Sequence, residues 1–444
     1  MDTRIHRLRP LATLCAVFAL ACGSGKAASS SATGGSGASG GSGTAGGPGA
    51  SGGAGAAAGG SGGSSTGPFP VQMCTAGTAT CAANTVLPPS APVLTAGMWR
   101  DISPVEVPFG NTDPNNPTFT QGIAVDPCNA ATLYLCVDGF DTTAAKAGLY
   151  KSTDAGSSWT KIARVIPNFT GVDHLDEPIR VRIDPKNPQH LYVVDGVRGG
   201  TSGFWFSCDG GENFSQPESF AKLQADKGIY SLDTYDIAVD PTDFNHALVA
   251  SHSGWNADGD SGVLETTDGG SNWTVHMPLA GWGTGHAITF LFDLASKQGD
   301  SSTWLLSTQG GSRWRTSDAG STWTKVSSDA GIEHGGGTFY YDKNGVLYAS
   351  GFPSNQRSTD NGEHWLNIGG GSGTTAIIGD GTTLFSAPAF GPTPFLTSPE
   401  SDGLTWTPLN SQEFKQGPFE MVFDRANEIL YSGTWLSGML AYKE

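Results

Sequence analysis

Positive charge is scarce in this 444-residue sequence. It holds 24 Lys and Arg residues against 41 Asp and Glu residues, which gives a formal net charge of −17. Charged residues of both signs together make up 15% of the chain. Such a sequence offers no basic stripe for the phosphates of nucleic acids or anionic lipids. We therefore exclude nucleic acid as a partner.

The motifs of several common chemistries are also missing. There is no phosphate-binding glycine loop, no Gly-x-Ser-x-Gly elbow and no haem-attachment motif. The Cys and His residues show no spacing typical of a zinc site. We therefore expect no cofactor and no resident metal.

Long apolar runs are absent too, apart from one short run near the N-terminus. Arg4, Arg7 and Arg9 precede an apolar stretch over residues 11–21, which ends at Cys22. This stretch is too short to span a bilayer and is typical of a secretory signal peptide, here residues 1–21. The stretch 18–22, Phe-Ala-Leu-Ala-Cys, resembles a bacterial lipobox, although Ala19 stands where the family prefers Leu. The resemblance implies lipidation of Cys22; the alternative is ordinary cleavage nearby and full secretion.

Residues 22–67 are almost entirely Gly, Ser, Ala and Thr. A tract of this composition buries nothing and behaves as a flexible coil. We expect a disordered linker over 22–67, a lead-in segment over 68–96 and a folded domain over 97–444. The protein is then anchored through its lipid at the bacterial cell surface or outer membrane, or is otherwise secreted.

Cysteines of an exported chain meet an oxidising environment, in which disulfides form and persist. Cys74 and Cys81 are close in sequence, and Cys128 and Cys136 flank a turn between two apparent strands. Spacing predicts the pairs Cys74–Cys81 and Cys128–Cys136. Cys208 is then left over as a small buried hydrophobe.

One eight-residue pattern recurs along the domain. It reads Ser/Thr-x-Asp-x-Gly-x-x-Trp/Phe and occupies residues 152–159, 207–214, 266–273, 316–323 and 358–365, with a degenerate copy at 401–406. The Asp residues are Asp154, Asp209, Asp268, Asp318, Asp360 and Asp402. Asp can accept hydrogen bonds from its own turn, and Gly tolerates positive φ, so the pattern predicts a hairpin turn. Six near-identical carboxylates cannot all serve one active site.

This pattern resembles the Asp box, or BNR repeat, of sialidases and their propeller relatives. Each copy is preceded by an apolar strand that ends in Asp, as in 122–126, 181–184 and 237–240. That leading strand is similar to the xyloglucanase and sortilin (Vps10) branch of these propellers. The resemblance implies an all-β fold, a single β-propeller.

The two termini fix the number of blades. Leading strands number seven, whereas the turns number six, and the last unit stops one strand short of four. Residues 97–102, Gly-Met-Trp-Arg-Asp-Ile, match the outer strand at 157–162, Ser-Ser-Trp-Thr-Lys-Ile. We therefore predict seven blades, with the N-terminal strand completing the last blade and closing the ring.

Propeller ligands usually bind at the mouth of the central channel, on loops that enter the innermost strands and leave the second strands. The resulting catalytic candidates are Asp176, Asp233, His252 and His334, and the ligand-binding candidates are Arg180, Arg198, Tyr235, Trp255, His286 and Trp435. Glu177, Asp236, Glu420, Asp138 and Asp195 belong to the same loops. Aromatic faces stack on pyranose rings, and paired carboxylates can hydrolyse glycosidic bonds. Taken one at a time, each is more simply a solvated loop residue.

The enzyme families are matched only in part. A sialidase needs an Arg triad and a Tyr nucleophile, and only Arg180 in Pro-Ile-Arg-Val resembles its Phe-Arg-Ile-Pro box. Xyloglucanases use two propellers with a cleft between them, whereas this chain has length for one. The first hypothesis is therefore a monomeric binding propeller for an extracellular glycan or surface protein. The alternative is a glycoside hydrolase or polysaccharide lyase that uses carboxylate and His acid–base chemistry.

One acidic turn resembles the opening of a calcium loop. Residues 256–262 read Asn-Ala-Asp-Gly-Asp-Ser-Gly, which places Asp258 and Asp260 two apart. The Gly that such a loop needs at its sixth position is missing, so a plain acidic turn is the simpler interpretation and a calcium ion the alternative.

Overall fold

The computed structural model divides the chain into two units, Met1–Thr66 and Gly67–Glu444. The described residues all lie in the second unit: 73–74, 81, 84–110, 117–139, 145–162, 174–196, 201–229, 231–309 without 294–297, 312–328 and 339–444. Within the strands, the side chains of residues 286, 292–293 and 298–299 are outside the description. The predicted signal peptide, Cys22 and the Gly-rich linker also lie outside it.

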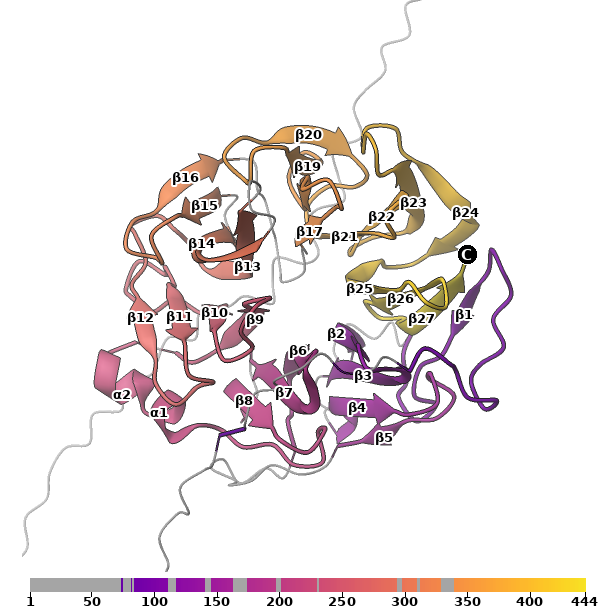
Figure 1. Ribbon diagram of the computed structural model, residues 1–444, viewed down its shortest axis with the longest axis horizontal. Helices are drawn as coiled ribbons and strands as arrows, with labels where there is room; N and C mark the ends of the chain where they lie inside the picture. The colour runs from indigo at the N-terminus through magenta and orange to yellow at the C-terminus, as the bar shows by residue number, and fades with distance from the viewer. Residues whose placement is uncertain are drawn as a thin grey trace, which may run out of the picture. The chain divides into compact units, whose positions relative to one another are not determined.

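Seven small antiparallel sheets stand around a central axis like the blades of a propeller (Figure 1). Blades 1 to 3 contain β2 (Thr118–Asp126), β3 (Asn129–Gly139), β4 (Gly148–Ser152), β5 (Thr160–Lys161), β6 (Pro178–Asp184), β7 (Asn187–Asp195), β8 (Gly203–Ser207), β9 (Thr234–Val239), β10 (Ala247–Ser251), β11 (Val263–Thr266) and β12 (Thr274–His276). Blades 4 and 5 contain β13 (Gly285–Asp293), β14 (Gln298–Thr308), β15 (Ser312–Thr316), β16 (Thr324–Ser327), β17 (Phe339–Tyr341), β18 (Leu347–Ala349), β19 (Asn355–Ser358) and β20 (Leu366–Gly369). Blades 6 and 7 contain β21 (Thr375–Gly379), β22 (Thr383–Pro388), β23 (Thr393–Pro399), β24 (Thr407–Phe414), β25 (Pro418–Asp424), β26 (Ile429–Thr434) and β27 (Gly438–Lys443).

Blade 2 departs from four strands among the described residues. Its sheet is β6-β7-β8, and an isolated bridge between Phe206 and Ser215 stands where the outer strand would run. Two short helices, α1 (Glu218–Ala221) and α2 (Leu223–Lys227), then lead to blade 3.

The ring closes as the sequence predicted. Strand β1 (Trp99–Asp101) pairs antiparallel with β27, with Trp99 opposite Tyr442, so the N-terminal strand completes blade 7. The Trp99 side chain packs on Phe395 and Tyr442, with ring centroids 4.4 and 5.2 Å away. The prediction of a seven-bladed, all-β propeller is confirmed, and closure leaves no open edge at this seam.

The hydrophobic core lies between neighbouring blades. Middle strands are buried on both faces, as in β3, where Leu133 packs toward blade 7 while Tyr134 packs toward blade 2. Each blade thus contributes one apolar face to each neighbour, which is why these strands read as continuous apolar runs.

The repeated sequence pattern forms one turn five times, and we call these segments the repeat turns (152–159, 207–214, 266–273, 316–323 and 358–365). In each, the Asp carboxylate accepts a backbone N–H from four residues later, at 2.8 to 2.9 Å. The Ser or Thr hydroxyl two residues before the Asp accepts the N–H of the Gly. These bonds occupy the carboxylates within their own turns. The degenerate copy is simpler, because Asp402 accepts only the Leu404 N–H within its turn, at 2.7 Å.

Two consecutive residues of each repeat turn have positive φ, not the Gly alone. The residue before the Gly also does so, even where it is Ala155, Ala319 or Asn361. The pair of left-handed residues turns the chain tightly from the third strand of a blade into the fourth.

The disulfides differ from the predicted pairs. Cys74 bonds to Cys208 with Cα atoms 5.3 Å apart, and Cys81 bonds to Cys128 with Cα atoms 5.7 Å apart. Cys136 is free and fully buried. The predictions Cys74–Cys81 and Cys128–Cys136 are therefore wrong, as is the assignment of Cys208 as a leftover. Cys136 lies in the middle of β3, where it packs between blades, and cannot reach Cys128 at the strand's far end.

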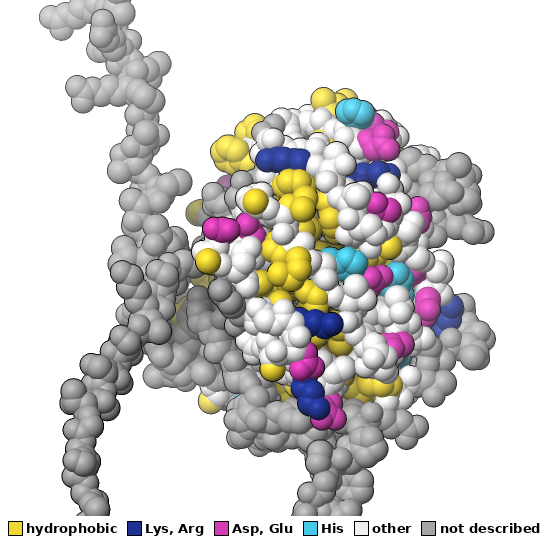
Figure 2. Space-filling model, turned by 90° about the vertical axis from the view of Figure 1, so that its left-hand side faces the viewer, with side chains coloured by type: hydrophobic (Ala, Val, Ile, Leu, Met, Phe, Trp, Pro, Cys, Tyr) yellow, Lys and Arg dark blue, Asp and Glu magenta, His cyan; other side chains and the backbone are white. Residues whose placement is uncertain are grey.

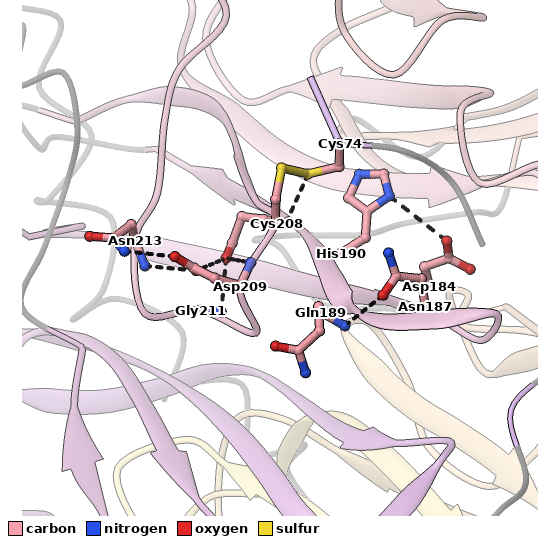
Figure 3. Close-up of a disulfide and its surroundings, with 10 residues drawn as sticks. Cys74, Asp184, Asn187, Gln189, His190, Cys208, Asp209, Gly211 and Asn213 are labelled. Atoms are coloured by element: carbon pink, nitrogen blue, oxygen red, sulfur yellow. Dashed lines mark hydrogen bonds and ion pairs between the residues drawn. A yellow bond between two sulfur atoms is a disulfide. The ribbon is translucent and has the colours of Figure 1, made fainter. Parts of the chain in front are cut away.

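These bonds attach the lead-in segment to the face that carries the repeat turns. Cys208 belongs to the repeat turn of blade 2, as Figure 3 shows, and Cys128 to the turn between β2 and β3. Residues 84–96 continue across blades 1 and 7: Asn84 bridges to Asn129, Leu87 and Leu94 pack on the core, and Ala96 bridges to Lys443. We call the described residues 73–96 the strap. It reinforces the seam where the ring closes.

A search of the described residues found no helix long and apolar enough to cross a membrane.

Candidate functional site

The mouth of the channel lies on the face opposite the repeat turns. The loops before each inner strand meet there with the turns that join the second and third strands. Most predicted site residues lie on these segments, apart from three whose surroundings cannot be described. Arg198 and His334 fall outside the described residues, and so does the side chain of His286.

Blade 2 brings three acidic residues together at the mouth, namely Asp176, Glu177 and Asp195. The Asp176 carboxylate accepts the backbone N–H and the hydroxyl of Thr201, and the Asp176 N–H donates back to that hydroxyl at 2.9 Å. Asp195, fully buried, accepts the Glu177 N–H at 3.2 Å. Burial, and then the neighbouring Asp176 charge, raises the pKa of Asp195 well above its usual value. This environment therefore favours the protonated form of Asp195 over the charged one.

Blade 3 holds an aspartate–histidine pair. The Asp233 carboxylate contacts His252 Nδ1 at 3.1 Å and accepts the Ser253 hydroxyl at 2.6 Å. The His252 ring also stacks on Tyr235 at a centroid distance of 5.2 Å. The structure thus unites Asp233, Tyr235 and His252, as the loop assignment predicted. Ser253 bonds to Asp233, however, and this orientation is not that of a Ser-His-Asp relay.

The channel itself contains a charged network. Arg182 Nη1 lies 3.0 Å from Glu420 Oε1, and both Arg182 and the buried Arg180 lie near Asp236 Oδ1, at 3.6 and 3.5 Å. Glu420 also accepts the Ile123 N–H, and Asp236 accepts the Ile288 N–H. These four side chains therefore join the inner strands of blades 7, 1, 2, 3 and 4.

A cavity of about 300 Å³ adjoins this network. Its lining passes from the four charged side chains to the apolar residues Ile288, Phe339 and Ile377. Arg180, predicted to bind ligand, is 1% exposed and already holds the carbonyl oxygens of Gln121 and Ile179. Its contacts with Gln121 of blade 1 and Asp236 of blade 3 connect blade 2 to both neighbours.

Trp255 is not available at the mouth. Only 1% of the residue is exposed, and it belongs to the core between blades 2 and 3. Its loop folds back because the Asp260 carboxylate accepts the N–H groups of Gly281 and Gly283, at 3.1 and 2.6 Å. The prediction that Trp255 contacts a ligand is wrong: loop position implied exposure, but this loop is anchored over its own aromatic.

The acidic turn behind Trp255 is held by backbone donors. Both Asp260 oxygens accept N–H groups, and Asp258 lies exposed with its own N–H bonded to the Asn256 side chain.

Trp435 stands at the mouth between blades 7 and 1. Phe119 lies against it at a centroid distance of 3.9 Å with its ring tilted by 31°, and Phe419 at 4.4 Å with its ring tilted by 18°. Two aromatic rings therefore pack against the indole, and Trp435 remains half-exposed. The edge of Phe390 approaches this stack at 5.8 Å from Trp435, and Phe390 itself is 39% exposed.

Phe390 and Phe352 are two functional candidates that the sequence reasoning missed. They lie in the turns after β22 and β18, and Trp435 lies in the corresponding turn after β26. Phe352 is 58% exposed. Three consecutive blades thus present an aromatic residue in the same turn, and we call Phe352, Phe390 and Trp435 the aromatic turn patch. The signal was visible as Gly-Phe-Pro, Phe-Gly-Pro and Trp-Leu-Ser, with the aromatic residue one to three residues after the second strand.

The described mouth segments therefore differ in chemistry from blade to blade. Blades 2 and 3 carry Asp176, Asp195, Asp233 and His252, most of which are hydrogen-bonded inward. The turns 350–354, 389–392 and 435–437 of blades 5 to 7 contain no charged residue at all. The rim is different again: the side formed by blades 3 and 4 mixes both charge signs with apolar side chains (Figure 2).

Comparisons with known proteins show similarity in structure but not in sequence. No protein-family model matches the chain, and no curated protein matches it. YCF48 bound to D1 peptide is similar with a TM-score of 0.50 and 15% identity, covering 80% of this chain and 99% of that one. A chain described as the extracellular domain of a hybrid two-component system from B. thetaiotaomicron gives 0.50 and 12%, covering 73% of this chain and 39% of that one.

An ancestral GH74 enzyme gives a TM-score of 0.38 and 18% identity, covering 76% of this chain and 36% of that one. Identities this low carry a fold and nothing finer. The chain therefore shares the β-propeller fold with YCF48 and with that extracellular domain.

Proposed function

We propose that this protein is an exported binding propeller that holds a neutral extracellular glycan on the aromatic turn patch without cleaving it. The observation that carries the proposal is the recurrence of an exposed or half-exposed aromatic in the same turn of three consecutive blades. Aromatic rings pack well against the apolar faces of sugar rings, and exposed rings without a structural role mark binding sites.

The chemistry of the patch favours a neutral ligand. Its turns hold Gly, Pro, Ser and aromatic residues, so they offer stacking surfaces and backbone or hydroxyl hydrogen bonds but no ion pair. The Trp435 edge adds an indole N–H, a donor suited to a sugar hydroxyl. Phe352 and Phe390 would supply the stacking faces, because they are more exposed than Trp435, against which Phe119 and Phe419 already pack.

The alternative is hydrolysis by the carboxylates of blades 2 and 3. It is favoured by one observation, that Asp176, Asp195 and Asp233 gather on the same mouth and that burial raises the pKa of Asp195. Against it, the Asp176 and Asp233 carboxylates each accept two or more hydrogen bonds from their own blade. Such bonds favour a structural role for both groups.

A polysaccharide panel tests both functions at once. Binding and release of reducing ends are measured with the wild type, with Phe390→Ala and Phe352→Ala, and with Asp176→Asn and Asp233→Asn. Each Phe→Ala change should weaken binding of a neutral glycan by about 30-fold, since it removes about 2 kcal/mol of apolar contact. The matched control is Leu404→Ala, an exposed apolar residue of blade 6 in the turn on the opposite face.

Undiminished glycan binding by Phe390→Ala and Phe352→Ala would contradict the proposal. Binding of peptides in place of glycans would assign the patch to a protein partner. Release of reducing ends that Asp176→Asn or Asp233→Asn abolishes would establish the hydrolase.

We also propose that the chain is exported and lipid-anchored at Cys22, on the sequence evidence of its apolar N-terminal run and lipobox-like residues. Metabolic labelling with a fatty acid tests this, because Cys22→Ala should abolish the label and release the protein into the medium. A wild-type protein that carries no label would contradict lipidation and favour ordinary cleavage with full secretion.

A further inference from the structure

Four ionisable side chains form an unbroken chain at the seam between blades 3 and 4. His246 Nδ1 lies 3.3 Å from Asp240 Oδ2, and His246 Nε2 lies 3.0 Å from Glu265 Oε1. The second Glu265 oxygen lies 2.8 Å from His276 Nε2. We call Asp240, His246, Glu265 and His276 the seam relay. All four side chains are at most 11% exposed.

The relay lies away from the mouth and reaches blade 4 at several points. Asp240 accepts the hydroxyl of Ser301 on β14. The His246 ring meets Phe290 edge-on at 4.7 Å, and the His276 ring meets Trp304 at 5.2 Å. His276 also lies under the repeat turn of blade 4, since a Cβ on Gly320 would fall 2.6 Å from its Nδ1.

Equivalent positions of blades 1 and 2 lack this set. Six residues after the Asp of the leading strand, blade 1 has Thr132, blade 2 has His190 and blade 3 has His246. Where blade 3 has Glu265, next to the first residue of its repeat turn, blade 1 has Lys151 and blade 2 has Phe206. Three residues after the turn aromatic, where blade 3 has His276, these blades have Ile162 and Pro217. Of these three blades, only blade 3 therefore carries the full titratable set.

Blade 2 therefore provides an internal control for the first half of the relay. His190 lies beside Asp184 at 3.8 Å, as Figure 3 shows, but neither ring nitrogen has a hydrogen-bond partner. Burial lowers the pKa of His190 to about 4, and Asp184 offsets this only in part. Without a Glu on the adjacent strand, this histidine stays neutral.

Among the described residues, the groups that act on the relay come from blades 3 and 4. On blade 3, Asp240 and Glu265 flank His246, and Glu265 alone holds His276. On blade 4, Asp300 is bound by Ser302 and Thr303, and Asp318 is bound within its own repeat turn. Burial opposes charge on His246, but Glu265 and then Asp240 outweigh it and raise its pKa.

We propose that the seam relay is a pH-responsive clasp, which holds blade 4 against blade 3 when His246 is protonated and loosens when it is not. Protonated His246 donates to both carboxylates, so that Asp240 is fixed toward Ser301 and Glu265 toward His276. Neutral His246 can donate from one nitrogen only, and one of the carboxylates then faces a lone pair. The seam is therefore tightest in mildly acidic surroundings and opens more readily as the medium becomes alkaline.

The test measures the histidine and the seam separately in the full chain. NMR titration of the His side chains, assigned by His246→Gln and His190→Gln, should place His246 above its unfolded value of about 6.5 and His190 below it. Hydrogen exchange in β12, the edge strand of blade 3 whose His276 ends the relay and pairs with Val263 of β11, reports how firmly the relay holds that strand at the seam. Corrected for the intrinsic effect of pH, this exchange should accelerate about tenfold between mildly acidic and alkaline pH. That factor corresponds to the loss of one charge-assisted hydrogen bond.

Glu265→Gln keeps the side-chain shape and removes the charge, so it should lower the His246 titration midpoint and flatten the pH dependence of exchange. His364→Gln is the matched control, since the His364 side chain is 86% exposed on a repeat turn, and it should leave both unchanged. A His246 midpoint at or below that of His190, or an exchange profile that Glu265→Gln leaves intact, would overturn the proposal. The wild-type titration decides the question even if Glu265→Gln does not fold.

Discussion

Removing the Cys74–Cys208 disulfide should be among the most damaging changes to this fold. The bond closes a loop of 134 residues, which encloses blade 1 and most of blade 2. Loop-closure entropy alone then gives about 5 kcal/mol of stabilisation, and about 4 kcal/mol for Cys81–Cys128 with its separation of 47. Because the second loop lies inside the first, the two bonds share part of this effect, and the double removal should cost less than the sum.

Urea unfolding of Cys74→Ser/Cys208→Ser, Cys81→Ser/Cys128→Ser and the combined variant measures these terms through the shift in midpoint at constant slope. Cys136→Ala, at the buried free cysteine, controls for the loss of a thiol without the loss of a crosslink. A loss below about 1 kcal/mol for the longer loop would refute the reasoning, because it would mean that the strap is held as firmly by packing alone.

Three further predictions concern stability. Ala319→Gly should stabilise the folded protein by up to about 1 kcal/mol, because Ala319 has φ +52°. Gly320→Ala should destabilise it by about 2 kcal/mol or more, because the new Cβ would meet the His276 ring and φ is +76°. Urea midpoints that move in the opposite directions would contradict the turn geometry. The contribution of the seam relay to the free energy of unfolding should peak between about pH 4.5 and 6.5. The hydrogen bonds from His246 and His276 overcome burial and lower the pKa of Glu265 from 4.5 to about 2, so its share, about 3 kcal/mol, is lost as pH falls through that range. The stabilisation that His246 contributes is lost as pH rises through its raised pKa. Melting curves across pH, with Glu265→Gln as comparison, measure both effects. A melting temperature of the wild type that varies with pH no more than that of Glu265→Gln would contradict this prediction. Trp255→Ala truncates a core side chain and should lower the free energy of unfolding by about 4 kcal/mol, against less than about 0.5 kcal/mol for Leu404→Ala. Equal losses for the two variants in chemical denaturation would contradict the burial of Trp255.

The architecture could be predicted from sequence because its information is local and repeated. Each repeat turn needs only the Asp, the Gly and their immediate neighbours, so five copies mark five hairpins without any knowledge of distant contacts. The match between the strand around Trp99 and the outer strand around Trp159 then identified the partner of β27.

What failed depended on contacts between segments far apart in sequence. Proximity along the chain favoured Cys74–Cys81, whereas the two cysteines bond to different blades, Cys74 to Cys208 of blade 2 and Cys81 to Cys128 of blade 1. Trp255 lies in a loop by sequence, and only the bonds from Asp260 to Gly281 and Gly283 decide that it is buried. The partners of His246 likewise come from separate segments, Asp240 from the turn after β9 and Glu265 from β11, and no single stretch reveals them.

The position of the strap has a mechanical consequence. A force applied to the chain ahead of Met73 reaches the covalent Cys74–Cys208 and Cys81–Cys128 bonds before it reaches the backbone hydrogen bonds of β1 with β27. The non-covalent seam that closes the ring therefore carries little load while those bonds are intact. With both disulfides reduced, the same pull would act on β1 directly and peel it from blade 7. Because the strap lies on the repeat-turn face, tension on this side also leaves the opposite face, with its aromatic turns, pointing away from the direction of pull.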